Sequence, residues 1–598
     1  MKNQDKLGLY DSIALNEGAY FFKKGNLKIS KRLIDSVFSM VTADNCKKLT
    51  VVVRKNEMFG EDSQKTAIVS LLIFKNISTP SFIKFDGVIP KELKEEKIGY
   101  LLIVEIQRYV IIVKKNVAHL TPFIEKLEPI DANTLCSVMT DDRSVYQQVR
   151  LTNMNMSVEA MRNKSYEANN LTISMPTFNS NQSILNATKF INSSGICSIN
   201  VATSRLAKFG DKKSIRSLLE WMNNIVENIE GGVQQSPFFN LFAMPVSWKN
   251  KQEELTPASI LIDKFIIRNY LDKINDHNLY YGDAYVPMGG RAVSFLRQLE
   301  CISLTEDNGS YSAYHGKLRL LKQSNGISIR LKGLLNNIYY RENDGVYHKI
   351  INLLRLLHCF TVSFTDCHYV YYGRRLYNNI NICNDVTGIL STMKTCPQIN
   401  RIMSEKGNYI AINSTEFMPD TMFGVVENQL FVDADYLVCD DLGWELADHI
   451  AVKGDTISLI HSKCSDNVGF SASSFQEVIG QAVKNIGNLR QLGDIVEDKR
   501  ETWNSNWGNT AIPRCRRGTV DGIINKITTL RSNPNRVYEV CLAVNFISKA
   551  ELERAFGRII AGENFAQKNI VVQLVWILNG FISNCKDADM HCRIFCRE

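Results

Sequence analysis

The sequence predicts an α/β fold for the C-terminal third of the chain, preceded by α+β segments. From about residue 401 onward, apolar strand-like runs alternate with helical patterns, an order typical of α/β domains. In the first third, strand-like runs instead follow one another at 49–53, 67–74, 100–104 and 110–113. With 598 residues, the chain is too long for a single hydrophobic core, so we expect two or three domains.

The domain boundaries are predicted from breaks in these patterns. The range 165–194 is rich in Asn, Ser and Thr, which predicts a loop-rich connection. An amphipathic helix is predicted over 213–229, and Gly231, Gly232 and Pro237 break the chain after it. We therefore predict an N-terminal α+β domain over 1–232, a central β-rich or mixed domain over 233–400, and an α/β domain over 401–598.

Composition and charge limit the class of protein. Hydrophobic residues make up 45% of the chain and charged residues 22%, as in ordinary soluble proteins. The net charge of +8 permits a polyanionic partner without requiring one. No apolar leader opens the sequence, and the apolar stretch 100–113 is interrupted by Glu105, Gln107 and Arg108, so we expect no membrane association. The 15 cysteines are scattered without a disulfide-like spacing, which predicts reduced thiols and a cytoplasmic location.

One acidic segment stands out in the C-terminal third. Residues 427–452 contain seven carboxylates and no Lys or Arg. The seven are Glu427, Asp433, Asp435, Asp440, Asp441, Glu445 and Asp448. Such a density repels itself unless it is solvated or holds a cation. For Asp433 and Asp435 we expect a solvated surface.

Asp448 is expected to differ from its acidic neighbours. In a strand over 445–452, alternation places it on one face with Leu446, Ile450 and Val452. A carboxylate among apolar side chains needs a metal, a cation or a hydrogen-bond donor. The metal is the functional interpretation, and the alternatives are a pair with an Arg or a cap on a backbone turn.

A hairpin is predicted to follow Asp448. Residues 453–455 form its turn, and in the return strand 456–463 the side chains of His461 and Lys463 share one face. Asp448 followed by this hairpin and by Lys463 resembles the PD-(D/E)XK, or restriction-endonuclease-like, core. The resemblance implies a mixed sheet flanked by helices and hydrolysis of nucleic-acid phosphodiesters.

The resemblance also implies roles for the site residues. Asp448 would bind Mg²⁺ or Mn²⁺, and Lys463 would activate or position the attacking water. His461 stands where the family has a second acidic ligand, and imidazole suits Mn²⁺ better than Mg²⁺. His461 is therefore either a ligand or an acid–base group, and Glu445 is a substitute carboxylate ligand. With neither carboxylate nor imidazole engaged, the site would be inactive.

A helix after the hairpin extends the resemblance. Residues 474–477 fit a capping box, opening an amphipathic helix that reaches about residue 489. Gln481 matches a glutamine of RecB-like members, whereas Asn485 stands where their tyrosine would be. Glu427, in the helix expected over 422–430, is the candidate for the family's helix-borne acid.

A basic segment follows the predicted site. Residues 484–536 contain ten Lys or Arg against five Asp or Glu, a net charge of +5. Lys484, Arg514, Arg516 and Arg517 are candidates for phosphate contacts, with Trp503 and Trp507 available for base stacking. The alternative is an ordinary solvated loop.

Residues 439–489 also resemble large bacterial proteins associated with defence against phage. The matching parts are Asp440–Asp448, Ile460–Lys463 and the Gly-Gln-Ala-Val-Lys-Asn run from Gly480. This implies a metal-dependent endonuclease, with DNA favoured over RNA. By analogy the chain could act as a homo-oligomer, and without a Walker motif an ATPase or helicase would be a separate chain. The alternative is a non-catalytic nucleic-acid-binding or assembly subunit with a degenerate nuclease fold.

Two other groups of metal-ligating residue types are weaker candidates. His358, Cys359, Cys367 and His368 are adjacent pairs, which do not easily present a tetrahedron to zinc. His591, Cys592 and Cys596 are expected in the core or tail.

Overall fold

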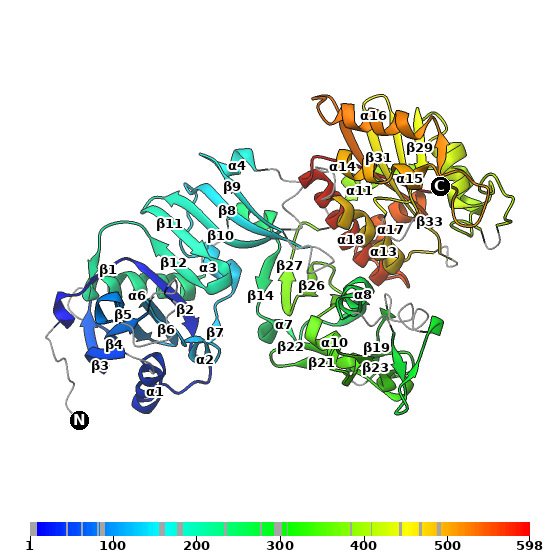
Figure 1. Ribbon diagram of the computed structural model, residues 1–598. Helices are drawn as coiled ribbons and strands as arrows, with labels where there is room; N and C mark the ends of the chain where they lie inside the picture. Colours follow the sequence, from blue (N-terminus) through cyan, green and yellow to red (C-terminus); the bar gives the residue numbers. More distant parts are fainter. Residues whose placement is uncertain are drawn as a thin grey trace. The chain divides into compact units, whose positions relative to one another are not determined.

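The computed structural model shows a mixed α/β protein (Figure 1). It describes residues 9–42, 46–60, 64–79, 83, 90–154, 162–175, 183–232, 236–274, 278–291, 302–307, 309–382, 386–407, 410–441, 445–465, 469–486 and 492–598. The chain divides into two compact units. One comprises 1–152, 163–175 and 184–247, and the other comprises 153–162, 176–183 and 248–598.

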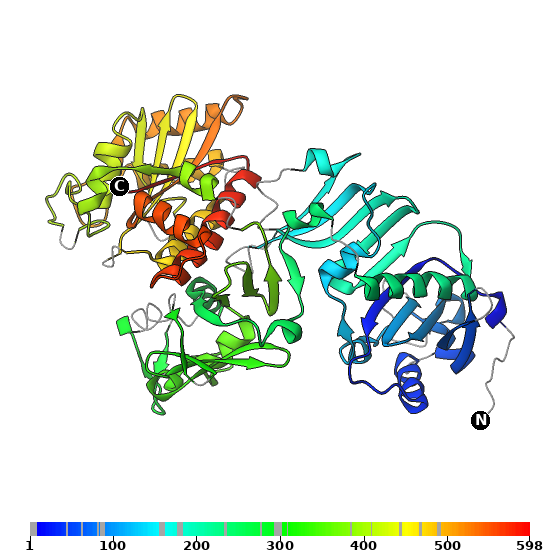
Figure 2. The same ribbon diagram turned by 180° about the vertical axis from the view of Figure 1, so that it is seen from behind.

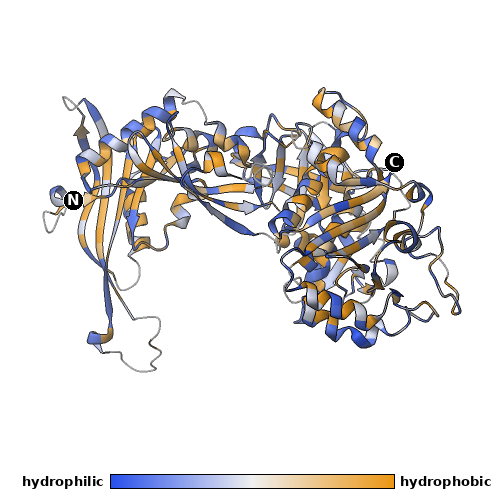
Figure 3. Cartoon of the chain, turned by 90° about the horizontal axis from the view of Figure 1, so that it is seen from above, coloured by the Kyte–Doolittle hydropathy of each residue, from blue (hydrophilic) through white to orange (hydrophobic). Residues whose placement is uncertain are grey.

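The N-terminal unit is built on an antiparallel sheet. In chain order its strands are β2 (Gly18–Lys23), β3 (Cys46–Phe59), β4 (Lys65–Ser78), β5 (Glu95–Ile106), β6 (Tyr109–Lys115), β7 (Glu128–Pro129), β8 (Val145–Asn153), β9 (Asn163–Glu167), β10 (Ser183–Asn192), β11 (Gly195–Asn200) and β12 (Arg205–Lys208). Its helices are α1 (Lys31–Val41), α2 (Thr121–Ile124), α3 (Ala132–Ser137), α4 (Leu171–Ser174) and α6 (Ile215–Gly231). The four predicted strands correspond to β3, β4, β5 and β6, and the predicted helix corresponds to α6. In Figure 3 this sheet is mostly hydrophobic, because helices pack on both of its faces.

The prediction of a loop-rich connection over 165–194 is wrong in part. β10 runs through this range and pairs antiparallel with β11. Leu185 and Phe190 are buried, so the Asn, Ser and Thr residues are partly the polar face of a strand. Composition alone hides this alternation.

The two compact units differ from the three predicted domains. The first unit ends at Ser247 rather than at 232, because Phe238, Phe239 and Phe242 join the core of the N-terminal unit. No unit boundary lies near 400, and Ile389 and Met393 pack in the core of the C-terminal sheet. The predicted central domain therefore belongs to the same unit as the C-terminal one.

Small antiparallel sheets form the first part of the second unit. Their strands are β15 (Pro257–Ile262), β16 (Tyr280–Tyr281), β17 (Val286–Pro287), β18 (Ile302–Ser303), β19 (Thr305–Asp307), β20 (Ser310–Ala313), β21 (Leu318–Gln323), β22 (Gly326–Leu331), β23 (Ile338–Arg341), β24 (Tyr347–Lys349), β25 (Phe360–Phe364), β26 (Tyr369–Tyr372) and β27 (Arg375–Asn378). Its helices are α7 (Trp248–Lys251), α8 (Lys264–Lys273) and α10 (Ile350–Leu357). This part is β-rich, as predicted.

The C-terminal part contains a mixed sheet of seven strands in the order β28-β34-β33-β31-β30-β29-β32. The strands are β28 (Met393–Thr395), β29 (Tyr436–Cys439), β30 (His449–Lys453), β31 (Thr456–Lys463), β32 (Cys515–Arg517), β33 (Val537–Ser548) and β34 (His591–Arg597). β29, β30 and β31 form an antiparallel meander, and β31, β33, β34 and β28 run parallel. The C-terminal ends of the parallel strands therefore share one edge of the sheet.

Helices cover both faces of this sheet. They are α11 (Val386–Thr392), α12 (Met422–Val425), the π-helical turn η9 (Val426–Leu430), α13 (Ala472–Ile486), α14 (Leu492–Asp498), α15 (Arg500–Trp503), α16 (Val520–Leu530), α17 (Lys549–Ile560) and α18 (Lys568–Asp587). α13, α17 and α18 pack together on one face, seen from both sides in Figures 1 and 2. α14 and α16 extend that layer over the meander, and α12 with η9 covers the opposite face. None of the described helices has the length and apolar character needed to cross a membrane.

Candidate metal centre

Three carboxylates converge beside the N-terminal end of β30. Single oxygens of Asp441, Glu445 and Asp448 lie within 4.8 Å of one another. Asp441 follows β29 by two residues, and Asp448 directly precedes β30. The predicted strand over 445–452 thus begins at His449, and residues 442–444 lie outside the described residues. Because β29 and β30 pair antiparallel, the two ends of the connection between them lie side by side.

Asp448 is held by the backbone of the neighbouring strand. The N–H of Ser462 donates a 2.7 Å hydrogen bond to Asp448 Oδ2. Among the described residues, this bond takes the place of the Arg partner or turn cap that were the alternatives. It also places Asp448 beside the residue that precedes Lys463.

Burial makes the charged form of Asp448 unfavourable. The residue is 7% exposed. Burial raises the pKa of Asp448 well above its ordinary value, and the nearby carboxylates, Glu405 and Glu445 foremost, raise it further. The Ser462 N–H acts in the opposite direction but does not prevail. A bound cation would offset both the burial and the repulsion, because it is attracted to every carboxylate in the group.

Lys463 lies at the end of β31, and its ammonium group is paired with α13. Its Nζ lies 2.9 Å from Glu477 Oε1, and both side chains are about a quarter exposed. The predicted capping box at 474–477 is therefore wrong. The helix begins earlier, with Ser471 Oγ accepting from the N–H of Ser474. Glu477 thus lies inside the helix, and its carboxylate reaches Lys463 on the strand.

Gln481 lies on the side of α13 that faces the site. Residues four apart in a helix lie on one side, and Gln481 is midway between Glu477 and Asn485. Glu477 contacts Lys463, and Asn485 Nδ2 donates to the carbonyl of Glu445 at 3.1 Å. Asn485, standing where a tyrosine was expected, therefore supports the acidic connection. Lys484 is exposed on the same helix.

A buried network positions the carboxylate connection. Asp440 is fully buried and accepts from both Lys499 Nζ, at 2.6 and 2.7 Å, and Trp503 Nε1, at 2.8 Å. The N–H of Leu446 also donates to Asp440 Oδ2. Burial raises the pKa of Asp440, and the Lys499 charge opposes that rise.

A second cation lies next to the carboxylate group. Lys406 Nζ is 2.8 Å from an oxygen of Asp441, to which Trp507 Nε1 also donates. Burial lowers the pKa of Lys406, but its bond to Asp441 and the nearby carboxylates prevail and raise it. Sequence reasoning missed Asp441 as a ligand, missed Glu405 and Lys406 altogether, and assigned Glu477 to a capping box instead of to Lys463. Only the density of carboxylates pointed to Asp441.

The proposed ligand His461 is not part of the carboxylate group. It shares a sheet face with Lys463, as predicted, but it is 2% exposed. Burial lowers the pKa of His461 to about 4, so the imidazole is neutral at physiological pH. Its Nε2 has no hydrogen-bond partner in the described part of the chain. The structure thus gathers Asp448 and Glu445 with Asp441 in place of His461.

Glu427 lies on the opposite face of the sheet, within η9. Its Oε1 is 3.2 Å from His449 Nε2, and its Oε2 is 2.9 Å from Arg516 Nε. Since His449 follows Asp448 in an extended strand, its side chain points away from the carboxylate group. Glu427 therefore contacts β30 from the opposite face of the sheet and does not join the three carboxylates.

The three candidate phosphate-binding arginines of the basic segment are engaged within the protein. Arg514 is 5% exposed and donates to the carbonyls of Cys439 and Asp441. Arg516 pairs with Glu427, and Arg517 donates to the carbonyl of Phe431 at 2.5 Å. Arg516 and Arg517 lie in β32, which pairs with β29 in the sheet, so this part of the segment is not the solvated loop that was the alternative.

Trp503 and Trp507, the residues predicted to stack on bases, also pack within the protein. Trp503 is fully buried, which excludes base stacking on its ring. Trp507 packs against Phe417, with ring centroids 5.2 Å apart. Both indole N–H groups instead serve the carboxylate network.

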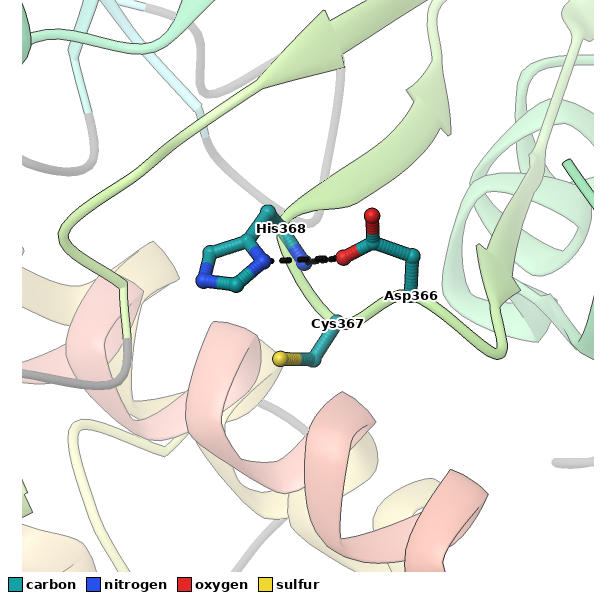
Figure 4. A group of neighbouring side chains, drawn as sticks. All are labelled: Asp366, Cys367 and His368. Carbon is teal, nitrogen blue, oxygen red and sulfur yellow. Dashed lines mark hydrogen bonds and ion pairs between the residues drawn. The ribbon is translucent and has the colours of Figure 1, made fainter. Parts of the chain in front are cut away.

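A second group of metal-ligating residue types lies in the turn between β25 and β26. Ligand atoms of Asp366, Cys367 and His368 lie within 4.8 Å of one another, and Figure 4 shows the three consecutive side chains. His368 Nδ1 is 2.8 Å from Asp366 Oδ1, and both side chains are more than 40% exposed. Cys359 is buried apart from them. Three consecutive residues of one surface turn do not enclose an ion, so this turn is the weaker candidate.

The chemistry of the three carboxylates fits a hard divalent cation. Carboxylate oxygens are ligands that Mg²⁺ and Mn²⁺ prefer. Asp448 is held by a backbone donor, and Lys463 lies one residue beyond that donor. This combination of clustered carboxylates and a lysine is suited to a reaction in which negative charge develops on a substrate.

Comparisons of the chain with family models, with curated proteins and with solved structures found no match.

Proposed function

We propose that the protein is a metal-dependent nuclease that hydrolyses nucleic-acid phosphodiesters, with DNA the favoured substrate. The observation that carries the proposal is the hydrogen bond from Ser462 N–H to Asp448, which joins the carboxylate group to the strand that ends in Lys463. The site lies at the edge of a mixed sheet where parallel strands end, the edge at which α/β folds bind ligands.

The arrangement of elements agrees with a PD-(D/E)XK-type core. Asp448 precedes a hairpin, the second strand of that hairpin ends in Lys463, and α13 follows with Gln481 facing the site. The sheet is mixed and is covered by helices on both faces. A role in bacterial defence against phage rests on the sequence resemblance alone.

Each residue has a distinct task in this proposal. Asp441, Glu445 and Asp448 would hold Mg²⁺ or Mn²⁺. The ion, when bound, supplies a nucleophile at neutral pH and compensates phosphate charge. Lys463 donates to a phosphate oxygen and stabilises the negative charge that grows there. Gln481 orients the phosphate or the attacking water. Glu477 holds Lys463 in place until substrate arrives.

A binding subunit without catalytic activity is the second candidate. Two observations favour it. Lys463 is already paired with Glu477, and His461 is buried and neutral where the family has an acidic ligand. In that case the protein would bind nucleic acid or assemble with a partner, and it would not hydrolyse the nucleic acid.

Cleavage assays separate the two candidates. Purified full-length protein is incubated with plasmid and single-stranded DNA in Mg²⁺ or Mn²⁺, beside Asp448→Ala and Lys463→Ala. A nuclease cuts only with metal, and both substitutions abolish cutting. Folded wild-type protein that binds DNA without cutting it in either metal would support the binding subunit.

A further inference from the structure

A pocket lined by arginines lies on the same edge of the C-terminal sheet as the carboxylate group. Its volume is about 530 Å³, and its lining includes Phe470, Arg554, Arg558, Phe565 and Arg597. Phe470 follows β31, α17 follows β33, and Arg597 ends β34. Because these strands are parallel, the pocket and Lys463 lie at the same edge.

The arginines differ in how far carboxylates neutralise them. Arg597 lies 3.5 Å from Glu551, and Arg558 lies 2.8 Å from Glu563. Arg554 is exposed on α17 and has no ion-pair or hydrogen-bond partner among the described residues. Among the described residues, the pocket therefore presents one guanidinium without a carboxylate partner and two that are partly compensated.

Aromatic packing fixes part of this pocket. The guanidinium carbon of Arg558 lies 4.3 Å from the centroid of the Phe565 ring, and Phe470 is buried in the adjoining core. Stacking restrains a guanidinium while leaving its N–H groups free to donate. Such a group loses less conformational freedom when it binds an anion.

We infer that this pocket binds a phosphate group of the nucleic acid whose scissile phosphodiester lies at the carboxylate group. The inference rests on the proposed function. Guanidinium groups match phosphate oxygens in geometry and charge. The carboxylates repel the polyanionic substrate until metal is bound, whereas the arginine pocket attracts it without metal.

The spacing along the edge suits two phosphates of one strand that lie a few nucleotides apart. Three strand intervals separate β30, beside which the carboxylates lie, from β34, which is roughly 14 Å. Phosphates of one strand of a DNA duplex rise about 3.4 Å per nucleotide along the helix axis, so the two places are about four nucleotides apart. The phosphate is either an internal phosphodiester or a terminal phosphomonoester.

Binding without metal tests the inference on the full-length chain. Fluorescence anisotropy with a single-stranded 20-nucleotide DNA in EDTA is measured for wild type, Arg554→Ala and Arg554→Lys. Arg554→Ala should weaken binding about fivefold at 0.1 M salt and reduce the log–log salt slope by about 0.7, the effect of one lost phosphate contact. Arg554→Lys keeps the charge and should keep the slope. Arg554 is exposed, and alanine favours helix, so the variant is expected to fold.

Arg536→Ala is the matched control. Arg536 is an exposed arginine that precedes β33, at the opposite edge of the sheet. It should change affinity less than twofold. Equal effects of Arg554→Ala and Arg536→Ala would overturn the inference, because they would reflect net charge alone.

Two further comparisons identify the phosphate and separate this inference from the proposed function. If Arg554→Ala weakens the binding of 5′- or 3′-phosphorylated DNA only, the pocket binds a terminal phosphate. If Arg554→Ala weakens the binding of unphosphorylated DNA equally, the pocket binds a phosphodiester of the backbone. Repeating the assay in Asp448→Ala protein shows whether the pocket acts when cleavage is impossible. If Arg554→Ala weakens DNA binding but wild-type protein never cleaves DNA, the pocket binds phosphate and the nuclease proposal is wrong. If wild-type protein cleaves DNA but Arg554→Ala leaves DNA binding unchanged, the nuclease proposal holds and the inference about the pocket is wrong.

Discussion

The backbone N–H of Ser462 donates a 2.7 Å hydrogen bond to Asp448 Oδ2, across the two strands of the β30–β31 hairpin. The bond holds the buried Asp448 carboxylate against Ser462, the residue that precedes Lys463. It also links the acidic connection to the strand that extends toward α13. The proposed chemistry depends on this relationship, and so do the following predictions.

Asp448→Asn should stabilise the metal-free protein at high pH. The pKa of Asp448 is raised in the folded state, so the folded chain binds a proton that the unfolded chain has lost. Stability therefore falls as pH rises from the ordinary pKa, about 3.9, to the raised value. Asn keeps the acceptor for Ser462 and carries no charge. We expect about 1–3 kcal/mol of added stability above that window and none below it.

Urea unfolding across pH in EDTA measures this effect. Asp433→Asn, in the same acidic segment but exposed, is the control and should lack the high-pH gain. Addition of Mg²⁺ or Mn²⁺ should stabilise wild type but not Asp448→Asn. Equal dependence of unfolding free energy on pH for wild type and Asp448→Asn would show that the fold does not raise the pKa of Asp448.

Lys463 and Glu477 should contribute unequally to cleavage. Lys463→Met removes the donor for phosphate and should lower the cleavage rate by a factor of about 10²–10³. Glu477→Gln removes only its partly exposed partner, so the rate should stay within about tenfold and stability within about 1 kcal/mol. Single-turnover cleavage measures both. A Glu477→Gln protein as inactive as Lys463→Met would assign the essential role to the pair.

The buried pair of Asp440 and Lys499 should be costly to break on one side. Lys499→Met leaves a buried carboxylate without its cation and should cost about 3–5 kcal/mol of unfolding free energy. The double variant Asp440→Asn with Lys499→Met removes both charges and should recover much of that loss. Urea unfolding of the two variants gives the comparison. A double variant as unstable as the single one would mean that packing, and not charge, dominates at this position.

Arg516 and Lys484 should separate stability from nucleic-acid binding. Among the described residues, Arg516→Ala leaves buried Glu427 with His449 as its remaining side-chain partner, so we expect a loss of about 2–4 kcal/mol and an unchanged salt slope for DNA binding. Lys484 is exposed, and Lys484→Ala should lower that slope without changing stability. Anisotropy titrations at several salt concentrations test both. A reduced slope for Arg516→Ala alone would restore its predicted role at the interface.

The strands were largely predictable because each has a local pattern. β3, β4, β5 and β6 lie where apolar runs predicted them, and β31 lies where the return strand of the hairpin was predicted. β10 was missed because its polar side chains resemble those of a loop. The boundary at 232 was misplaced because Phe238 and its neighbours return to a core that only tertiary structure reveals.

The candidate site was predictable in part, for the same reason. The position of Asp448 before a hairpin and of Lys463 at its end follows from strand alternation. The grouping of Asp441 with Glu445 depends on how the meander closes, and the pairing of Glu477 with Lys463 depends on where α13 begins. Arg514 and Arg516 appeared free for phosphate because their buried acceptors are remote in sequence.

Metal binding is the most direct test of the central claim. Isothermal titration of Mn²⁺ into metal-free full-length protein is compared for wild type, Asp448→Ala and Asp433→Ala. We predict stoichiometric binding by wild type and by Asp433→Ala, which strengthens as pH rises and Asp448 loses its proton, and no such binding by Asp448→Ala. Equal binding by all three proteins, or none by folded wild type, would contradict a metal centre at Asp441, Glu445 and Asp448.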